Sequence, residues 1–212
     1  MLALLPDWLD PQQLIDKGGL WLVAAIIFAE SCLVFFLPGD ALLFITGFLT
    51  TKAAAEKGLP HIGQPIVLVV LVLFVAAVLG NQVGYLIGRT TGAKLFGRPN
   101  SKLFSQKNLD KSHDFFERHG SKTVVLARFV PVVRTFAPIV AGMSRMKYRT
   151  FGTFNLVGAA IWAIGVTLLG YFLGRIEFIK NHIELAAVGI VALSFVPIIL
   201  EYRKHRQTAV GH

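Results

Sequence analysis

The stretch of sequence that decides the fold is Thr123–Ser144, which reads TVVLARFVPVVRTFAPIVAGMS. It is largely apolar, yet it carries two arginines, Arg128 and Arg134, and two prolines, Pro131 and Pro138. A charge at membrane depth costs about 2.5–3.5 kcal/mol on insertion scales, and proline breaks a helix interior. A plain spanning helix is therefore a poor description. The stretch predicts a re-entrant helical hairpin, which enters a membrane and leaves it on the same side.

The distribution of Lys and Arg supports this hairpin. Residues 89–122 contain eight Lys/Arg and three Asp/Glu, so this linker is expected in the cytoplasm by the positive-inside rule. If the hairpin returns to the cytoplasm, 14 Lys/Arg lie inside, five lie outside and two lie within the hairpin. A full crossing would instead carry the basic segment Arg145–Arg149 and the basic C-terminal tail outside.

A similar stretch occurs earlier in the chain. Gly18–Thr51 has 34 residues and is interrupted only by the charges of Glu30 and Asp40. As one helix it would measure about 51 Å, longer than the hydrocarbon core of about 30 Å but too short for two crossings. A Pro-Gly pair in its middle favours a turn. The residues expected at the turns of the two hairpins are Pro38, Gly39, Pro131 and Pro138.

Three segments are long and apolar enough to be considered as spans. Ile66–Gly88 has 23 residues without a charge, and Thr150–Gly174 has 25. Because about 20 apolar residues cross the hydrocarbon core, both predict transmembrane helices. Leu185–Leu200, at 16 residues, is followed by a basic cluster and predicts a final span.

The composition agrees with a membrane protein. The chain of 212 residues is 54% hydrophobic and only 16% charged, with a mean hydropathy of +0.63, whereas soluble domains carry about 25% charge. The single cysteine, Cys32, excludes a disulfide framework and a multi-cysteine metal site. No metal site or cofactor is expected. The net charge of +9 is assigned to membrane orientation, and no nucleic-acid partner is expected.

The predicted fold class is an all-α integral membrane protein. It is an inverted repeat of two re-entrant helical hairpins, each followed by a transmembrane helix, plus a C-terminal transmembrane helix. The predicted divisions are an N-terminal extramembrane segment (1–17), a membrane domain (18–180) with hairpin 18–51, span 66–88, cytoplasmic linker 89–122, hairpin 123–144 and span 150–174, and a C-terminal helix with a basic tail (181–212). The protein is expected in the bacterial inner (cytoplasmic) membrane as a multi-pass protein, with its C-terminus in the cytoplasm and its N-terminus outside.

A short motif supports the repeat. Gly84–Arg89, GYLIGR, recurs as Gly170–Arg175, GYFLGR, and each copy closes a long span. Inverted repeats of this kind are common in transporters. The alternative is that six residues recur by chance or as generic interface anchors. Glycines four apart on one helix face predict close helix packing; they are Gly80, Gly84, Gly88 and Gly92. Two polar residues within the spans, Asn81 and Asn155, are expected to form interhelical hydrogen bonds, with lining of a substrate path as the alternative.

Four ionisable residues at membrane depth are the candidate site. Glu30 and Asp40 come from the first hairpin, and Arg128 and Arg134 come from the second. If the repeats face each other, the four groups can meet in one polar cavity. Half-helices starting near Asp40 and Pro138 would point their N-termini inward, where backbone N–H groups favour an anion. Two arginines there predict a phosphate site, because the guanidinium binds phosphate in a bidentate manner.

The two acids predict proton exchange. Burial disfavours the charged form of a carboxylate and a neighbouring arginine favours it, so a phosphate that binds the arginines would change the protonation of Glu30 and Asp40. Three simpler roles stay open at this point. Asp40 could be a helix N-cap, Arg128 could extend to the cytoplasmic interface, and a Glu30–arginine pair could be purely structural.

These residues resemble the DedA family of bacterial inner-membrane proteins, relatives of the SNARE-associated Golgi (VTT-domain) proteins. The resemblance covers about residues 18–180 and is carried by Glu30, Phe36–Leu43 (FLPGDALL), Gly84–Arg89, Ala127–Gly142 (ARFVPVVRTFAPIVAG) and Gly170–Arg175. Phe35 stands where many members have proline, and Asp40 where many have glutamate. The resemblance implies facing re-entrant loops and proton-motive-force-dependent transport of undecaprenyl phosphate or of a phospholipid such as phosphatidylethanolamine. It maps the functional acids onto Glu30 and Asp40, and the functional arginines onto Arg128 and Arg134.

The sequence therefore predicts a lipid flippase rather than an enzyme. The expected partners are a lipid phosphate headgroup, the bilayer and protons, and a homo-oligomer is compatible with the sequence. An acid-phosphatase-type membrane enzyme would need Lys/Arg-Pro and Pro-Ser-Gly-His motifs, and the chain has no such pair, no His-Glu-x-x-His and no Walker A loop. A proton-coupled ion antiporter that uses the two acids, and a membrane-assembly factor that transports nothing, remain alternatives.

Overall fold

The computed structural model describes residues 11–32, 39–56, 58–59, 61–96, 123–126, 128, 131–176 and 189, and every regular element in these ranges is helical. The helices are α1 (Pro11–Cys32), α2 (Gly39–Leu49), α3 (Lys52–Glu56), α4 (Ile66–Phe96), α6 (Thr123–Leu126), α7 (Pro131–Met143), α8 (Tyr148–Ala159), the π-helical turn η4 (Ala160–Ile164) and α9 (Gly165–Leu173). The expected final span over 185–200, the basic tail and most of the linker lie outside the described residues.

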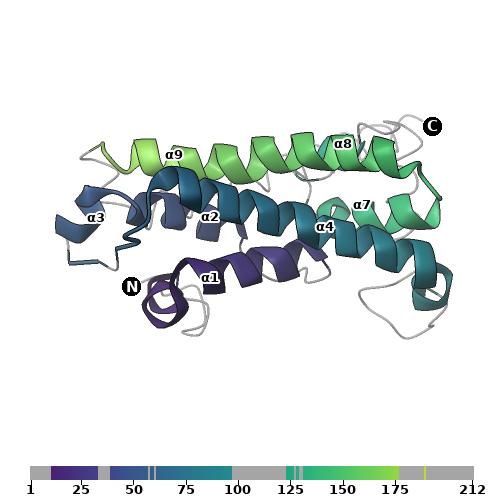
Figure 1. Cartoon of the computed structure of the whole chain (residues 1–212), viewed down its shortest axis with the longest axis horizontal. Coiled ribbons are helices and arrows are strands. Elements are labelled where there is room, and N and C mark those ends of the chain that lie inside the picture. Colours follow the sequence, from purple (N-terminus) through teal and green to yellow (C-terminus); the bar gives the residue numbers. More distant parts are fainter. Residues whose placement is uncertain are drawn as a thin grey trace, which may run out of the picture.

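Two long antiparallel rods dominate the molecule. Helix α4 runs along its whole length, and α8, η4 and α9 join into a second rod that runs the opposite way (Figure 1). In the described part of the chain, two helical stretches are long and apolar enough to cross a membrane, Ile66–Thr91 and Tyr148–Leu173, each of 26 residues. Both predicted spans are therefore confirmed as continuous helices of membrane-spanning length.

The outer faces of both rods are apolar. Large exposed hydrophobic side chains follow α4 and the α8–α9 rod at helical spacing: Val67, Leu68, Leu71, Val75, Leu79, Leu86, Leu156, Val157, Ile161, Leu169 and Phe172. Exposure of so much contiguous apolar surface is rare in soluble monomers. These faces are suited to contact with lipid.

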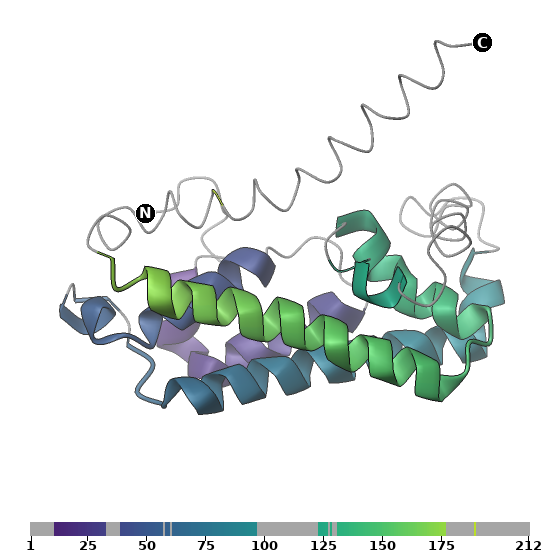
Figure 2. The same ribbon diagram turned by 90° about the horizontal axis from the view of Figure 1, so that it is seen from above.

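The remaining helices are short. Helix α1 is interrupted at Gly19 (φ 56°, ψ −151°), α2 has 11 residues and α7 has 13. At 1.5 Å per residue, α2 and α7 measure about 16 and 20 Å, less than the hydrocarbon core of about 30 Å. Figure 2 shows α1 and α2 at one end of the rods and α7 at the other. Pro38, expected at the first turn, lies outside the described residues, and the re-entrant path of the hairpins stays a prediction.

One expected turn is wrong. Pro138 lies inside α7, and the helix begins seven residues earlier, at Pro131. Proline costs nothing at the first helical position, where its missing N–H would have no partner in any case. The ring of Pro138 packs against α4 at Gly84, whose missing side chain leaves room for it. Arg134 consequently lies in the first turn of the half-helix.

Helix α7 packs closely on α4. A Cβ added at Gly88 would collide with the carbonyl of Ile139, and one added at Gly142 would collide with the carbonyl of Tyr85. Glycine at both positions lets the two backbones touch, as small residues do in membrane helix pairs. The expected packing role is confirmed for Gly88, for Gly84 against Pro138, and for Gly80 against Phe28 of α1; for Gly92 it stays a prediction.

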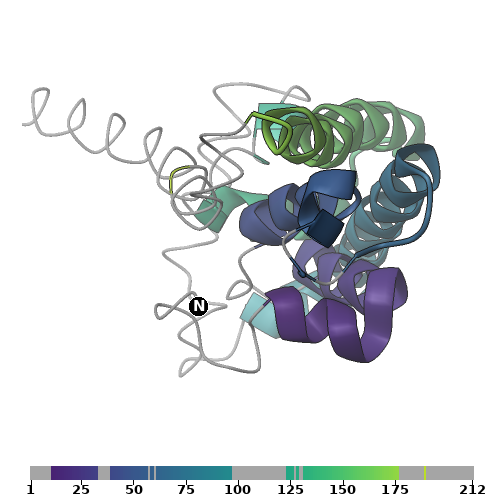
Figure 3. The ribbon, with the colours of Figure 1, turned by 90° about the vertical axis from the view of Figure 1, so that its left-hand side faces the viewer.

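Helix α2 packs on α9 through glycine contacts of the same kind. A Cβ at Gly170 would collide with the carbonyl of Phe44, and one at Gly47 with the carbonyl of Thr167. The two copies of the repeated motif thus have equivalent neighbours, and each repeat contributes one short helix to the other repeat's span. Seen end-on, α2 lies beside the α8–α9 rod (Figure 3).

The tyrosine and arginine of the motif form the same hydrogen bond in both copies. Arg89 donates to the Tyr85 hydroxyl one turn earlier (3.3 Å), and Arg175 donates to the Tyr171 hydroxyl. Tyr85 is fully buried, donates to the carbonyl of Met146 (2.6 Å) and stacks on Phe151 at a ring separation of 4.4 Å. This contact fastens the first rod to the start of the second.

We predict that Gly88→Ala and Gly170→Ala each lower the free energy of unfolding by about 1–3 kcal/mol, because an added methyl group in a tight contact forces the backbones apart. The measurement is denaturant unfolding of the purified protein in detergent micelles. Gly152→Ala is the matched control, since nothing lies within 4 Å of its added Cβ, and it should leave stability unchanged or raise it by up to about 1 kcal/mol. Equal effects at the three positions would contradict the packing described.

Candidate functional site

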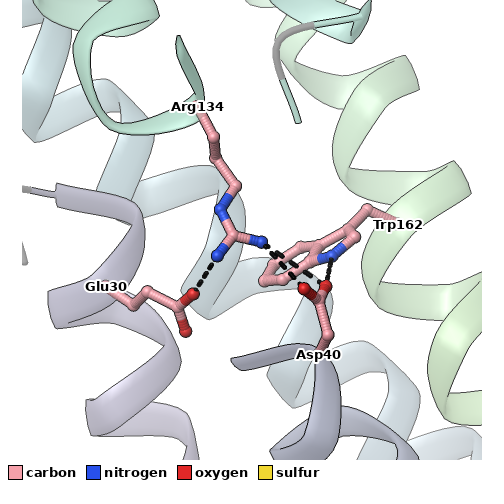
Figure 4. A network of polar contacts seen from close by, with 4 residues as sticks. All are labelled: Glu30, Asp40, Arg134 and Trp162. Carbon is pink, nitrogen blue, oxygen red and sulfur yellow. Dashed lines mark hydrogen bonds and ion pairs between the residues drawn. The ribbon is translucent and has the colours of Figure 1, made fainter. Parts of the chain in front are cut away.

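Three charged residues from three helices meet in the interior (Figure 4). Arg134, in the first turn of α7, donates through one guanidinium nitrogen to Glu30 Oε1 (2.5 Å) and through the other to both oxygens of Asp40 (3.4 Å). The side chains are only 13%, 3% and 13% exposed for Arg134, Glu30 and Asp40. The expected meeting of the two acids with Arg134 is confirmed, whereas Arg128, expected in the same cluster, forms no ion pair with either acid among the described residues.

Local structure explains why each side chain reaches the cluster. Glu30 is in the last turn of α1, and its carboxylate lies against Gly39, where any Cβ would overlap it. Asp40 is in the first turn of α2, where the helix dipole favours a negative charge. The dipole of α7 disfavours a cation at Arg134, and the two carboxylates offset this. Because α2 begins at Gly39, Asp40 lies inside its first turn and binds side chains of other helices.

Trp162 is a fourth member of the cluster that sequence reasoning missed. Its indole Nε1 donates to Asp40 Oδ1 (2.5 Å), and its ring lies 5.2 Å from the guanidinium carbon of Arg134 and 5.6 Å from that of Arg128. It belongs to the π-helical turn η4, and such turns are frequent at functional sites. The sequence signal that could have identified it was a tryptophan, which carries an N–H donor, in the middle of an uncharged apolar stretch.

Arg128 also lies near Trp162, 5.6 Å from its ring centroid, and is 3% exposed. Extension to the cytoplasmic interface is therefore wrong for this residue. Its guanidinium donates to Asn155 Oδ1 (2.9 Å), and Gly158 leaves room for its stem, since a Cβ there would come within 3.0 Å of it. Among the described residues, no carboxylate lies within ion-pair distance of Arg128.

The two asparagines join the rods beside Arg128. Asn81 of α4 donates to Asn155 Oδ1 of α8 (3.0 Å), and Asn155 donates to the carbonyl of Val78 (3.2 Å). With the oxygen and nitrogen of its side-chain amide exchanged, Asn81 donates to the carbonyl of Ser31 (2.9 Å) and accepts from Arg128 (3.0 Å). The predicted interhelical hydrogen bonding of both residues is confirmed.

The site thus holds two acids and two bases in an apolar interior, with no net formal charge when all four are ionised. Such a cluster is stable only while its members stay paired, because an uncompensated buried charge costs several kcal/mol. In the described part of the chain, no group of three or more His, Cys, Asp and Glu residues could hold a metal ion. In chemical terms, the two guanidinium groups could bind an anion and the two carboxylates could bind protons.

Comparison with known proteins gives consistent matches. The VTT domain family model matches residues 37–172. The chain is 43% identical over 202 residues to "Protein DedA" of Escherichia coli K12, covering 93% of this chain and 89% of the relative. It is 42% identical over 216 residues to "Uncharacterized membrane protein ML0287" of Mycobacterium leprae (97% and 93% covered), and 33% identical over 178 residues to "Inner membrane protein YqjA" of Escherichia coli K12 (82% and 75% covered). No solved structure matches the chain.

We predict that Glu30→Gln and Arg134→Gln each lower the free energy of unfolding by about 3–5 kcal/mol, since Glu30→Gln removes the nearer of the two carboxylates that neutralise Arg134, and Arg134→Gln leaves both buried acids without their cation. The double variant should lose less than the sum, by about 1–3 kcal/mol, because it removes both charges. The measurement is a double-mutant cycle by denaturant titration in micelles. Glu30→Gln combined with Arg149→Gln, an exposed arginine on α8, is the additive control. Additivity of the Glu30 and Arg134 changes would contradict the buried pair.

Proposed function

The chain belongs to the VTT-domain (DedA) family of membrane proteins, and on that premise we propose that it moves a phosphate-bearing lipid between the leaflets of the membrane, coupled to protons. The candidate substrates are undecaprenyl phosphate and phospholipids. The single observation that carries the proposal is the burial of Glu30, Asp40, Arg128 and Arg134 around Trp162. Four charges at this depth cost stability, and such residues in membrane proteins mark a substrate or proton pathway.

The arginines suit a lipid phosphate. A guanidinium binds phosphate oxygens through two parallel hydrogen bonds, and such bonds are strongest where water is excluded. The exposed apolar faces of α4 and of the α8–α9 rod leave the hydrocarbon tail of a substrate in contact with lipid while only its headgroup enters the protein. Transport of the headgroup requires no bond to be made or broken, so the proposed activity is not enzymatic.

The acids suit proton coupling. A phosphate that enters beside Glu30 and Asp40 brings a further negative charge into the same interior, and a like charge disfavours the ionised form of a carboxylate. Uptake of a proton by either acid would restore neutrality and also loosen its hold on Arg134. Headgroup entry and proton uptake would then occur together, and a proton gradient would give transport its direction.

We predict that Arg128→Ala, Arg134→Ala, Glu30→Gln and Asp40→Asn each slow lipid exchange by at least about tenfold, the loss expected when one hydrogen bond to a charged group disappears. The measurement follows labelled polyprenyl phosphate and labelled phospholipids between leaflets of proteoliposomes, with and without a pH gradient. Wild-type exchange should respond to the gradient.

Thr153→Ala, an exposed position on α8, is the control and should exchange lipid at the wild-type rate. Size-exclusion profiles establish that each variant is folded. Undiminished exchange in the four charge variants would refute the mechanism. Absence of lipid exchange together with cation–proton exchange would favour the antiporter instead.

A further inference from the structure

The two arginines occupy different electrostatic environments. Arg134 contacts two carboxylates, at 2.5 and 3.4 Å, whereas the partners of Arg128 are the neutral amide of Asn155 and the ring of Trp162. The Nε of Arg128 is buried and has no hydrogen-bond partner among the described residues. A buried cation without a direct ion pair is costly, and a bound anion would offset that cost.

We propose that the phosphate binds at Arg128, in a subsite formed with Asn155 and Asn81 beside Trp162. Arg134 stays with Glu30 and Asp40 as an internal counter-charge. This inference rests on the proposed function and deepens it by locating the anion. The ligand class is a phosphate group, carried by a lipid or free in solution.

Electrostatics favour Arg128 over Arg134 as the receptor. An anion that approaches Arg134 meets two carboxylates already bound to its guanidinium, and it must displace one of them or accept their repulsion. At Arg128 it meets a guanidinium with an unused N–H and no acid at contact distance in the described part of the chain. Charge-assisted hydrogen bonds to phosphate form there without breaking an ion pair.

The neutral residues are built to hold the receptor in place. Asn155 accepts from Arg128 (2.9 Å) and is itself anchored to the carbonyl of Val78 (3.2 Å), so its amide cannot turn freely. Gly158 provides the space that the Arg128 stem occupies. With its amide oxygen toward Arg128, Asn81 also accepts a hydrogen bond from this guanidinium (3.0 Å), so two neutral amides hold the receptor.

Trp162 supplies the readout. Its ring lies within 5.6 Å of the Arg128 guanidinium carbon, so binding of an anion there changes the charge beside the indole and its fluorescence. The chain has three tryptophans, and Trp8→Phe/Trp21→Phe leaves Trp162 as the only one. The full-length protein in this background is purified in detergent and titrated with inorganic phosphate and, separately, with phosphatidic acid at constant neutral pH.

The first comparison uses Arg128→Lys and Arg134→Lys, which both keep the charge but remove the planar fork. The dissociation constant for phosphate should rise at least about tenfold more in Arg128→Lys than in Arg134→Lys. An equal or larger rise in Arg134→Lys would overturn the proposal.

The second comparison covers the case in which a lysine variant does not fold. Asn155→Asp keeps the shape of the side chain and pairs with Arg128, so it should fold and yet abolish phosphate binding by neutralising the receptor. Thr153→Asp adds the same charge at an exposed site on the same helix and should bind phosphate like the parent. Wild-type affinity in Asn155→Asp, or no binding of either probe to the parent, would overturn the proposal.

The two probes separate the sources of the phosphate, since a response to phosphatidic acid alone identifies a lipid headgroup and an equal response to both identifies the phosphate group itself. The same variants in the leaflet-exchange assay separate this proposal from the transport function. Phosphate binding that depends on Asn155 without any lipid exchange would refute transport and keep the subsite. Lipid exchange that is indifferent to Asn155→Asp would refute the subsite and keep transport.

Discussion

The position of Arg134 between Glu30 and Asp40 is the interaction on which the rest of the structure depends. It joins α7 to α1 and α2. Arg134 lies 104 residues after Glu30 and 94 residues after Asp40 in the sequence. Because a buried charge without a partner is far more costly than a missing apolar contact, the three helix ends are held to one arrangement. Trp162 adds the second rod to it through its bond to Asp40.

Glycine contacts make this meeting of charges possible. Gly88 and Gly142 bring α7 against α4, and Gly47 and Gly170 bring α2 against α9, so the two half-helices approach the middle of the molecule from opposite ends (Figure 2). Helix α7 packs on α4, and α2 packs on α9. The charged N-terminal turns of α2 and α7 meet, and Asp40 and Glu30 contact Arg134.

The glycine contacts contribute mainly to stability, and the ion cluster contributes mainly to the specificity of helix pairing. Backbone contact over the length of α4 and α9 supplies dispersion energy that does not depend on charge. The ion cluster contributes little net stability once its desolvation is counted, but it restricts which helix ends can meet. In the proposed transport mechanism, protonation of an acid or entry of an anion would change the cluster without separating the helix pairs.

The sequence by itself determined the two long helices, the role of the repeated glycines, the hydrogen bonds of Asn81 and Asn155, and the meeting of Glu30 and Asp40 with Arg134. These follow from local composition, spacing and the cost of isolated charge in an apolar medium, which are legible along one chain. Only the tertiary structure decided that Pro138 continues a helix, that Trp162 enters the cluster, and that Arg128 is bound by neutral amides without a direct ion pair to the acids in the described part of the chain. Each of these depends on a contact with another helix. The Pro138 ring packs against Gly84, the Trp162 indole donates to Asp40, and the Arg128 stem lies against Gly158. No pattern along the chain encodes such pairings, because they arise only when distant helices are packed together.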